Sequence, residues 1–424
     1  MIEVLKAPAR GRGVAAERVT RDVAEMLLRI ERKGEAAVRD YSRTLDGWDP
    51  PAFLVDGGAL ARAAGAVPDD LREHVAFSQA QVRAFAAAQR ATLTDVEIEP
   101  LPGVTLGHRH LPVGAVGAYV PGGRYPMFAS SFMTVLVAKA AGVPHVVACT
   151  PPAQGRLPPA VMLHAIATSG ADAVLCLGGV QALAAMAFGL CGAEPVDMLV
   201  GAGNAYVAEA KRQLFGRVGI DLIAGPTEVL VIADEEADPD LVAADLLGQA
   251  EHGPSSPAVL VTTSRELAAA VLDRIPGLVE RWSTGAVAGE AWRSCGEVLL
   301  VADAEEAAAV ADARAPEHLE VHARELDWWL ERLRSYGSLF LGDEATVAYG
   351  DKGVGTNHVL PTGRAARYTG GLWVGKFVKT VTYQRLTAEG TSRVAPAIAA
   401  ISHAEGFTGH AATAELRLAR ARAR

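Results

Sequence analysis

From about Gly114 onward, short runs of β-branched and aliphatic residues alternate with stretches that are long enough for a helix. This alternation is typical of parallel sheets, because two parallel strands need a crossover connection of a dozen or more residues, usually a helix. The runs form two successive sets, so the sequence predicts two α/β units. The predicted strands are residues 115–120, 145–150, 173–177, 197–200, 221–224 and 228–233 in the first set, and 258–263, 297–301 and 338–341 in the second.

The first hundred residues show a different pattern: apolar residues recur at helical spacing, with charged residues between them. This spacing predicts helices that precede the first α/β unit, and similar spacing recurs within the second. At 424 residues the chain is long enough for two or three domains with cores of their own. The predicted helices are 15–32, 34–44 and 68–89 near the start, and 238–250, 265–275 and 325–336 later.

Charge and hydropathy exclude several classes of partner. The formal net charge of -9 gives no basic field for nucleic acid or an anionic membrane surface, so a small molecule is the expected partner. No apolar run reaches the roughly 20 residues of a membrane span, and the start of the chain lacks a signal-peptide pattern. We therefore expect a cytoplasmic protein in which Cys149, Cys176, Cys191 and Cys295 are reduced thiols.

Glycine-containing turns follow three of the predicted strands, at residues 121–123, 178–181 and 201–204. Glycine lets the backbone approach a ligand, and a helix that begins directly after such a turn favours a phosphate. Each turn alone is better explained by the need for a tight bend, and none completes the GxGxxG pattern. Three turns in succession favour a nucleotide at the carboxyl ends of these strands.

Four side chains of metal-ligand type stand in or beside glycine-containing segments. Gln249 and His252 are three residues apart at the end of a predicted helix, and Asp351 and His410 each follow a glycine. Oxygen and nitrogen donors of this kind suit zinc or a similar divalent ion, although a glutamine ligand is uncommon and the set contains no thiolate. Spacing does not establish that residues so far apart meet, so a zinc site built from these four is a hypothesis.

An acid stands beside an imidazole at Glu317 and His318, directly after Pro316. An imidazole with a pKa near neutrality suits repeated proton transfer, and a carboxylate activates water. Adjacent residues of an extended segment point in opposite directions, so both serve one site only if the backbone turns there. The alternative is a solvated charged loop.

Six segments of the chain resemble those of histidinol dehydrogenase and occur in the same order through almost the whole sequence. The resemblance implies that a primary alcohol is oxidised with two NAD, through an aldehyde held in the site, to a carboxylate. The reaction of the family converts L-histidinol into L-histidine. The segments are GAGNAYVAEAKRQ (201–213), AGPTEVLVIAD (224–234), GQAEHGP (248–254), APEHLE (315–320), GDKGVGTNHVLPT (350–362) and AEGFTGH (404–410).

The resemblance also implies roles for residues that match the motifs of the family. His318 would take the alcohol proton, and Glu317 would activate the water that attacks the aldehyde. One zinc ion per subunit would be bound by Gln249, His252, Asp351 and His410. Substrate contacts fall on Thr227, His358 and Glu405, and NAD contacts fall on Tyr119, Gln181 and Asn204.

The architecture implied by the resemblance is an α/β fold with two incomplete Rossmann-like domains, small helical N- and C-terminal extensions, and an intertwined homodimer. In this dimer, the C-terminal tail with Glu405 and His410 would act in the site of the partner subunit. The expected parts are an N-terminal segment (1–15), a larger discontinuous domain (16–118 and 229–372), a smaller NAD-binding domain (119–228) and the tail (373–424).

Two cations depart from the pattern of the biosynthetic enzymes. Arg124 stands where a small residue is usual, and Lys376 lies in a segment that is usually serine-rich and acidic. Such cations favour an anionic substrate, whereas histidinol is cationic. The chain therefore also resembles the sulfopropanediol 3-dehydrogenase branch of the family, which oxidises dihydroxypropanesulfonate to sulfolactate. Alternatively, Arg124 contacts an NAD phosphate or a surface carboxylate, and Lys376 is solvated.

Two functions from other classes remain open on the residues alone. A zinc hydrolase would use Glu317 to activate a metal-bound water and would be active without NAD. A nucleotide-binding module that has lost catalysis would bind NAD and turn over nothing. The order of the six segments argues against the hydrolase, and the presence of Glu317 and His318 together with the four metal donors argues against the inactive module.

Overall fold

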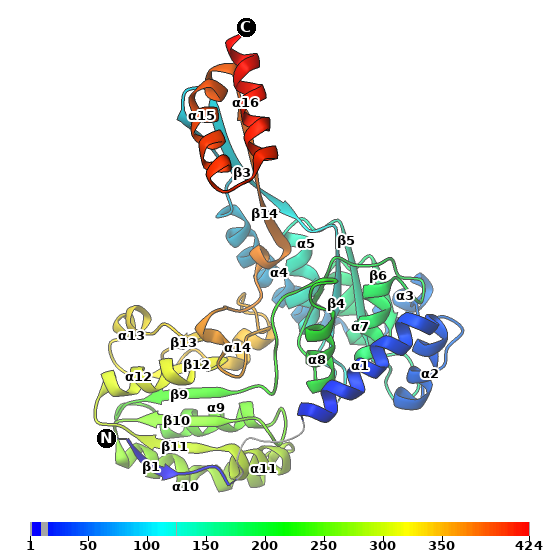
Figure 1. The fold of residues 1–424 in the computed structure, drawn as a ribbon. Helices are drawn as coiled ribbons and strands as arrows, with labels where there is room; N and C mark the ends of the chain where they lie inside the picture. Colours follow the sequence, from blue (N-terminus) through cyan, green and yellow to red (C-terminus); the bar gives the residue numbers. More distant parts are fainter. Residues whose placement is uncertain (1, 10–15, 124, 424) are drawn as a thin grey trace.

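The larger of two parallel sheets is built from the second half of the chain, in a computed structural model that describes residues 2–9, 16–123 and 125–423 (Figure 1). Its strands follow the order β1-β11-β10-β9-β12-β13, and all neighbours are parallel except β1, which is antiparallel to β11. The strands are β1 (Glu3–Lys6), β9 (Val229–Ala233), β10 (Ala258–Thr262), β11 (Glu297–Leu300), β12 (His318–His322) and β13 (Ser338–Leu341).

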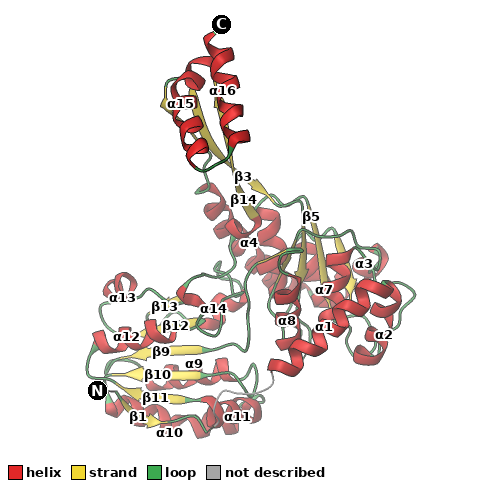
Figure 2. Ribbon diagram, viewed as in Figure 1, coloured by secondary structure: helices red, strands yellow, loops and turns green. Residues whose placement is uncertain are grey.

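Helices cover both faces of the larger sheet because most of its strands are apolar on both sides (Figure 2). Val229 and Val231 of β9 pack against α9, α10 and α11, whereas Leu230 and Ile232 pack against α12 and α13. Asp238 caps the start of α9 through its side chain, and Pro239 occupies the first turn. The helices are α9 (Pro239–Ala250), α10 (Arg265–Arg281), α11 (Gly285–Cys295), α12 (Ala304–Arg314), α13 (Leu326–Arg332) and α14 (Val347–Lys352).

The smaller sheet is wholly parallel, with the order β6-β5-β4-β7-β8. Counted along the chain this is 3-2-1-4-5, the order of doubly wound nucleotide-binding sheets, and β9 to β13 repeat it in the larger sheet. Ligands of such sheets bind where the order reverses, here between β4 and β7. The strands are β4 (Ala115–Tyr119), β5 (His145–Thr150), β6 (Ala173–Cys176), β7 (Met198–Val200) and β8 (Gly219–Ile220).

The helices of residues 16–91 pack on the smaller sheet, whereas we expected residues 16–118 to join the larger domain. The apolar stripe of α1, with Val23 and Ile30, is buried against α7 and α8 of the smaller unit. The domain boundaries themselves stay a prediction. The helices around the smaller sheet are α1 (Ala16–Lys33), α2 (Glu35–Asp46), α3 (Gly57–Ala66), α4 (Asp69–Ala91), η1 (Phe132–Leu136), α5 (Val137–Ala140), α6 (Ala160–Thr168), α7 (Gly179–Phe188) and α8 (Ala205–Leu214).

An arm stands away from both sheets and contains the C-terminus (Figure 1). It consists of a three-stranded antiparallel sheet in the order β14-β3-β2, followed by a pair of helices that pack on each other. Short 3-10 turns, η2 (Ala365–Arg367) and η3 (Val374–Phe377), precede β14 in the chain. The elements of the arm are β2 (Val96–Leu101), β3 (Val104–Pro112), β14 (Val378–Leu386), α15 (Ala388–Ala404) and α16 (Thr408–Arg422).

The predicted strands agree with the structure except at one position, and one buried strand of the larger sheet was missed. Residues 221–224 are not a strand, because the chain pairs with β7 two residues earlier, at Gly219 and Ile220. The missed strand is β12, where polar residues alternate with Leu319 and Val321 and break the apolar run. The edge strand β1 and the three arm strands were also not predicted.

The four cysteines are free thiols, as expected: Cys149, Cys176 and Cys191 are buried, and Cys295 is partly exposed. Within the described parts of the chain, no helix combines the length and the apolar character that a membrane crossing requires.

Candidate active site

A cavity of about 900 Å³ lies between the two α/β units. The turns that follow β4, β6 and β7 form one wall, at the carboxyl ends of the smaller sheet's strands. Thr227 and Glu317 belong to the other wall, and they precede β9 and β12 at the amino ends of these strands. The cavity therefore lies between the carboxyl ends of the strands of the smaller sheet and the amino ends of β9 and β12 of the larger sheet. Its polar lining includes Asp22, Asp46, Tyr119, Ser130, Gln181, Asn204, Thr227, His252, Glu317, His318, Asp351 and His358.

Glu317 and His318 both reach this cavity because the chain turns just before them. Ala315 ends α12 in the left-handed conformation, with a φ of 48°, and Pro316 follows. Oε2 of Glu317 accepts hydrogen bonds from the hydroxyl of Thr227 at 2.5 Å and from the backbone N–H of Glu228 at 3.0 Å. The same oxygen lies 3.5 Å from Nδ1 of His318. The acid and the imidazole thus form one buried pair.

His318 is held between two carboxylates. Its Nε2 lies 3.6 Å from Oδ1 of Asp351, and its Nδ1 lies 3.1 Å from the carbonyl oxygen of Glu228. Burial alone would lower the pKa of His318, but Glu317 and Asp351 outweigh it and raise the pKa to about 10. A divalent cation bound at Asp351 would oppose this rise, because it neutralises the charge that keeps the proton on His318.

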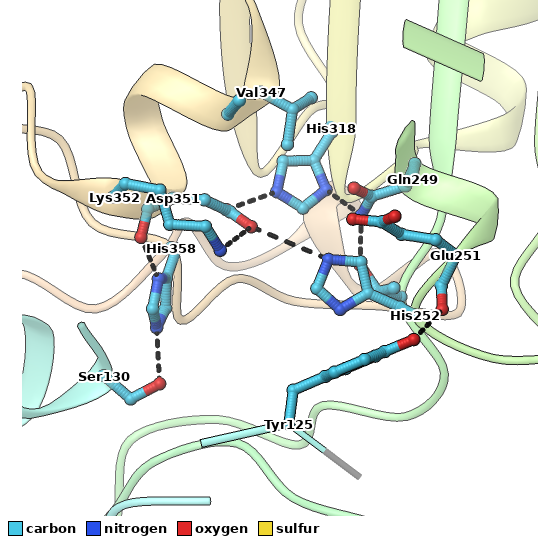
Figure 3. A network of polar contacts seen from close by, with 12 residues as sticks. Tyr125, Ser130, Gln249, Glu251, His252, His318, Val347, Asp351, Lys352 and His358 are labelled. Carbon is cyan, nitrogen blue, oxygen red and sulfur yellow. Dashed lines mark hydrogen bonds and ion pairs between the residues drawn. The ribbon is translucent and has the colours of Figure 1, made fainter. Parts of the chain in front are cut away.

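Three of the four predicted metal donors gather beside His318 (Figure 3). Nε2 of His252 lies 3.9 Å from Oδ2 of Asp351, so both atoms can contact one ion whose ligand bonds are about 2 Å long. The side-chain amide of Gln249 lies 3.2 Å from Nδ1 of His318 and also donates to Thr227. Burial lowers the pKa of His252, which keeps its imidazole neutral and able to bind a metal. His252 and Asp351 therefore fit a zinc ion with positions left open, and Gln249 lies beside them through His318.

The fourth predicted donor lies elsewhere in the chain. His410 is exposed on α16, and Glu405 is exposed at the end of α15, both in the arm. Neither residue lines the cavity of its own chain. Within one chain of this structure, the arm and the other three donors therefore lie apart.

The remaining predicted substrate residues divide into three cases. His358 lines the cavity, where Nε2 lies 2.9 Å from the hydroxyl of Ser130 and Nδ1 lies 2.8 Å from the backbone carbonyl of Asp351. Lys376 donates to the hydroxyl of Thr369 at 2.9 Å and is not among the described residues that line the cavity. Arg124 lies outside the described residues.

The three predicted NAD residues lie in the cavity wall of the smaller unit. The hydroxyl of Tyr119 accepts a hydrogen bond from the backbone N–H of Gly179 at 3.2 Å, at the start of α7. Gln181 donates to Asp46 at 2.8 Å, and Oε1 of Gln181 is buried without a hydrogen-bond partner among the described residues. Asn204 caps α8 through its side-chain oxygen. Two helix starts therefore line the cavity, together with Gln181.

A family model described as histidinol dehydrogenase matches residues 10–418. The chain belongs to the histidinol dehydrogenase family. It is 52% identical over 95% of its length to a histidinol dehydrogenase homolog of Shouchella clausii, and it covers 95% of that protein. It is 49% identical over 99% of its length to the sulfopropanediol 3-dehydrogenase of Ruegeria pomeroyi, and it covers 97% of that protein.

A solved member of the family has the same fold. The crystal structure of histidinol dehydrogenase from Elizabethkingia anophelis matches with a TM-score of 0.91 at 30% identity, over 98% of this chain and 94% of that one. The predicted α/β fold with parallel sheets is therefore confirmed, and the chain is an oxidoreductase of the histidinol dehydrogenase family.

Two residues of this family site were not foreseen from the sequence. Asp46 binds Gln181 from the end of α2, and Ser130 binds His358 from the segment before η1. Neither residue stands in a motif, because an aspartate at a helix end and a serine before a helix are ordinary local features. Their roles arise from packing between elements distant in the chain.

Gly201 begins the glycine turn after β7, directly before the cavity-lining Ala202, and we expect its replacement to be costly. It has a φ of 111°, and a Cβ atom there would lie 2.3 Å from the carbonyl oxygen of Tyr119. Gly201→Ala is therefore expected to lower the free energy of unfolding by about 2 kcal/mol or more, and to weaken NAD binding as the turn shifts. Urea unfolding followed by circular dichroism measures the first effect, and fluorescence titration with NADH measures the second.

Gly216 offers a matched control, since its φ is 99° and no atom lies within 4 Å of a Cβ placed there. Gly216→Ala carries the backbone strain without the clash and should cost only about 1 kcal/mol. Equal losses in the two variants would contradict the role given to the close contact between Gly201 and Tyr119.

Proposed function

We propose that this oxidoreductase converts a primary alcohol into a carboxylate through a bound aldehyde, with two NAD as co-substrates and one zinc ion per subunit. One observation carries the proposal: the buried pair of Glu317 and His318 shares a cavity with the glycine turns of a nucleotide-binding strand order. A hydrolase needs no nucleotide, so the wall formed by the glycine turns would have no role in it.

The alcohol step depends on His318. This imidazole takes the hydroxyl proton as a hydride leaves the alcohol carbon. NAD, when bound, accepts one hydride in each of the two oxidations. The contacts of His318 with Glu317 and Asp351 fix the ring, so its nitrogen atoms keep a constant direction toward the substrate.

The water step depends on Glu317. Its carboxylate takes a proton from a water molecule while the water oxygen adds to the aldehyde carbon. The Glu317 carboxyl then returns this proton to the former carbonyl oxygen, which gives the aldehyde hydrate and restores the carboxylate. The hydrate is again an alcohol, and His318 deprotonates it for the second oxidation once its first proton has passed to solvent. Hydrogen bonds from Thr227 and Glu228 hold Glu317 in place for this attack.

Zinc is proposed to bind Gln249, His252 and Asp351 of one chain together with His410 of the partner subunit. When bound, the ion would supply an anchor for the substrate alcohol, and the activation of water would stay with Glu317. The donor set supports this assignment, because neutral nitrogen and oxygen ligands suit zinc and the fourth donor is absent from the cavity of the single chain.

A homodimer that shares its sites is supported by the shape and surface of the arm. The arm extends away from its own chain's sheets and carries His410 and Glu405 on its surface (Figure 1). Large apolar side chains are exposed on it, as expected of a surface that packs against another chain. They are Ile98, Ile398, Ile401, Phe407 and Leu416.

Two substrates are candidates for this site. L-histidinol is the substrate of the family reaction and carries an amine that can bind the metal. Dihydroxypropanesulfonate is favoured by the 49% identity with a sulfopropanediol 3-dehydrogenase. The described residues that line the cavity include four carboxylates and no lysine or arginine, so an anionic substrate would depend on the metal, on Arg124 or on residues of the partner subunit.

The test is the yield of NADH from limiting amounts of each candidate, with an uncharged diol as the control. We expect two NADH per molecule of the true substrate, because the aldehyde stays bound until it is oxidised. Two NADH from histidinol alone would identify the biosynthetic activity, and two from the sulfonate alone would identify the sulfopropanediol activity. One NADH with release of aldehyde, or product without NADH, would contradict the proposal.

A further inference from the structure

A second cluster of metal-ligand type lies at the far end of β12 from the active site. It consists of Asp245 on α9 and Glu320 and His322 on β12, and one ligand atom of each lies within 4.8 Å of the others. Oδ2 of Asp245 is 3.3 Å from Nε2 of His322. His318 and His322 are four residues apart on a strand, or roughly 13 Å at about 3.3 Å per residue. The cluster is therefore separate from the predicted zinc site.

Strand geometry explains why these side chains converge. Leu319 and Val321 pack against α12 and α13 on one face of the sheet, so Glu320 and His322 point to the other face, toward α9. Asp245 lies one helical turn before Gln249 on α9 and meets them there. The core packing of β12 thus places an imidazole and two carboxylates in one spot.

In each of the three side chains, the polar atom that points away from the centre of the cluster contacts another group. Nδ1 of His322 lies 3.1 Å from Oδ1 of Asp343, Oδ1 of Asp245 accepts from the hydroxyl of Thr346 at 2.9 Å, and Oε1 of Glu320 accepts from the backbone N–H of Val347 at 2.9 Å. A carboxylate on the outer nitrogen of a histidine is the usual support of a metal-binding imidazole, since it directs the other nitrogen to the ion.

The atoms that point into the cluster form no hydrogen bonds among the described residues, although Nε2 of His322 lies within ion-pair distance of Asp245. Oε2 of Glu320 and Nε2 of His322 are buried and form no hydrogen bond within the described parts of the chain. Glu320 is 0% exposed, and it lies beside a second carboxylate, that of Asp245. A buried carboxylate beside a second carboxylate is costly unless a positive charge lies between them. The cluster thus has the donors, the supports and the unpaired buried carboxylate oxygen of a cation site.

We infer that Asp245, Glu320 and His322 bind a second divalent transition-metal ion, of which Zn²⁺ is the best match, in addition to the catalytic zinc. Two carboxylates and one imidazole, without a thiolate, are a ligand set for zinc with water in the fourth position. The inference does not depend on the proposed reaction, because no residue of the cluster lines the active-site cavity.

The ion would fix the elements that carry the catalytic residues relative to each other. Asp245 shares α9 with Gln249, and Glu320 and His322 share β12 with His318. Thr346, which binds Asp245, is the N-cap of α14, the helix that carries Asp351. A metal at this cluster therefore ties together α9, β12 and α14 from behind the site.

The test is the metal content of the full-length protein after saturation with Zn²⁺ and dialysis, measured by plasma mass spectrometry. Wild type should hold two ions per chain. Glu320→Gln keeps the shape and the acceptor for Val347 but removes the charge, and His322→Gln removes the imidazole; each should hold one ion. His252→Gln, at the catalytic zinc site, should also fall to one, and the double variant with His322→Gln should hold almost none.

His145→Gln is the matched control, because His145 is a partly buried histidine that faces Asp172 outside both sites, and it should keep two ions. Asp343→Asn changes only the half-exposed carboxylate that contacts Nδ1 of His322, so this variant should fold normally. Its affinity for the second ion should fall about ten-fold to a hundred-fold. Wild type with a single ion that His252→Gln abolishes and His322→Gln leaves unchanged would overturn the inference. A protonated His322 would then balance the carboxylates.

Discussion

Glu317→Gln is expected to reduce oxidation of the aldehyde to the carboxylate by roughly 10²-fold to 10⁴-fold, the range of general base catalysis, while oxidation of the alcohol falls far less. The amide has nearly the same shape and still accepts hydrogen bonds from Thr227 and Glu228, but it cannot take a proton from water. Rapid mixing of enzyme and NAD with alcohol or with aldehyde measures the two steps separately as NADH formation.

The variant should also release free aldehyde, which a carbonyl trapping reagent detects. Glu251→Gln is a suitable control, because Glu251 lies beside the site but its carboxylate accepts from Thr284 and does not line the cavity. It should keep both steps within a few-fold of wild type. Equal losses in the two steps of Glu317→Gln would remove the water-activating role and leave Glu317 as a support for His318.

The second large effect is expected in the full conversion of the alcohol to the carboxylate, from mixing two variants that are each impaired in this conversion. His410→Asn should lose at least about a hundred-fold in activity as a homodimer because a zinc ligand is missing, and Glu317→Gln is impaired as described above. A heterodimer with one chain of each kind contains one site with an intact Glu317 and an intact His410 of the partner subunit. We expect this heterodimer to recover roughly half of the wild-type rate, because one of two sites is whole.

Differently tagged chains allow the heterodimer to be purified after joint refolding and compared with both homodimers. A site made by a single chain gives the opposite result, since each chain would then carry one lesion in its own site and the mixture would stay inactive. Refolded wild type is the control for recovery. The measurement therefore distinguishes a dimer whose sites are shared between chains from a dimer in which each chain forms its own site.

The local chemistry of the site could be read from the sequence because it depends on neighbours along the chain. Glycine turns after β4, β6 and β7 and the donors around Gln249 are short-range features, and they predicted which residues would carry chemistry. The pair of Glu317 and His318 was also visible, but its geometry was not. The left-handed Ala315 that turns the pair into the cavity leaves no signal, because alanine rarely adopts this conformation.

The strand β12 could not be recognised as a buried strand from its residue pattern. A buried parallel strand is usually an unbroken apolar run, whereas His318, Glu320 and His322 alternate with apolar residues in this one. The pattern matched a solvated loop as well as it matched a strand. Only the packing of α9 and α14 against the polar face shows that this face is buried and binds charged partners.

The sequence by itself determined the parallel α/β class and the chemical character of each segment, since both follow from periodicity and residue type within a few positions. Tertiary structure decided which segments meet. It packed residues 16–91 on the smaller sheet, set the amino ends of β9 and β12 against the glycine turns, moved His410 out on an arm, and closed Asp245, Glu320 and His322 into a cluster. These outcomes depend on contacts between residues far apart in the chain, where the burial of whole surfaces determines the arrangement and no local signal exists.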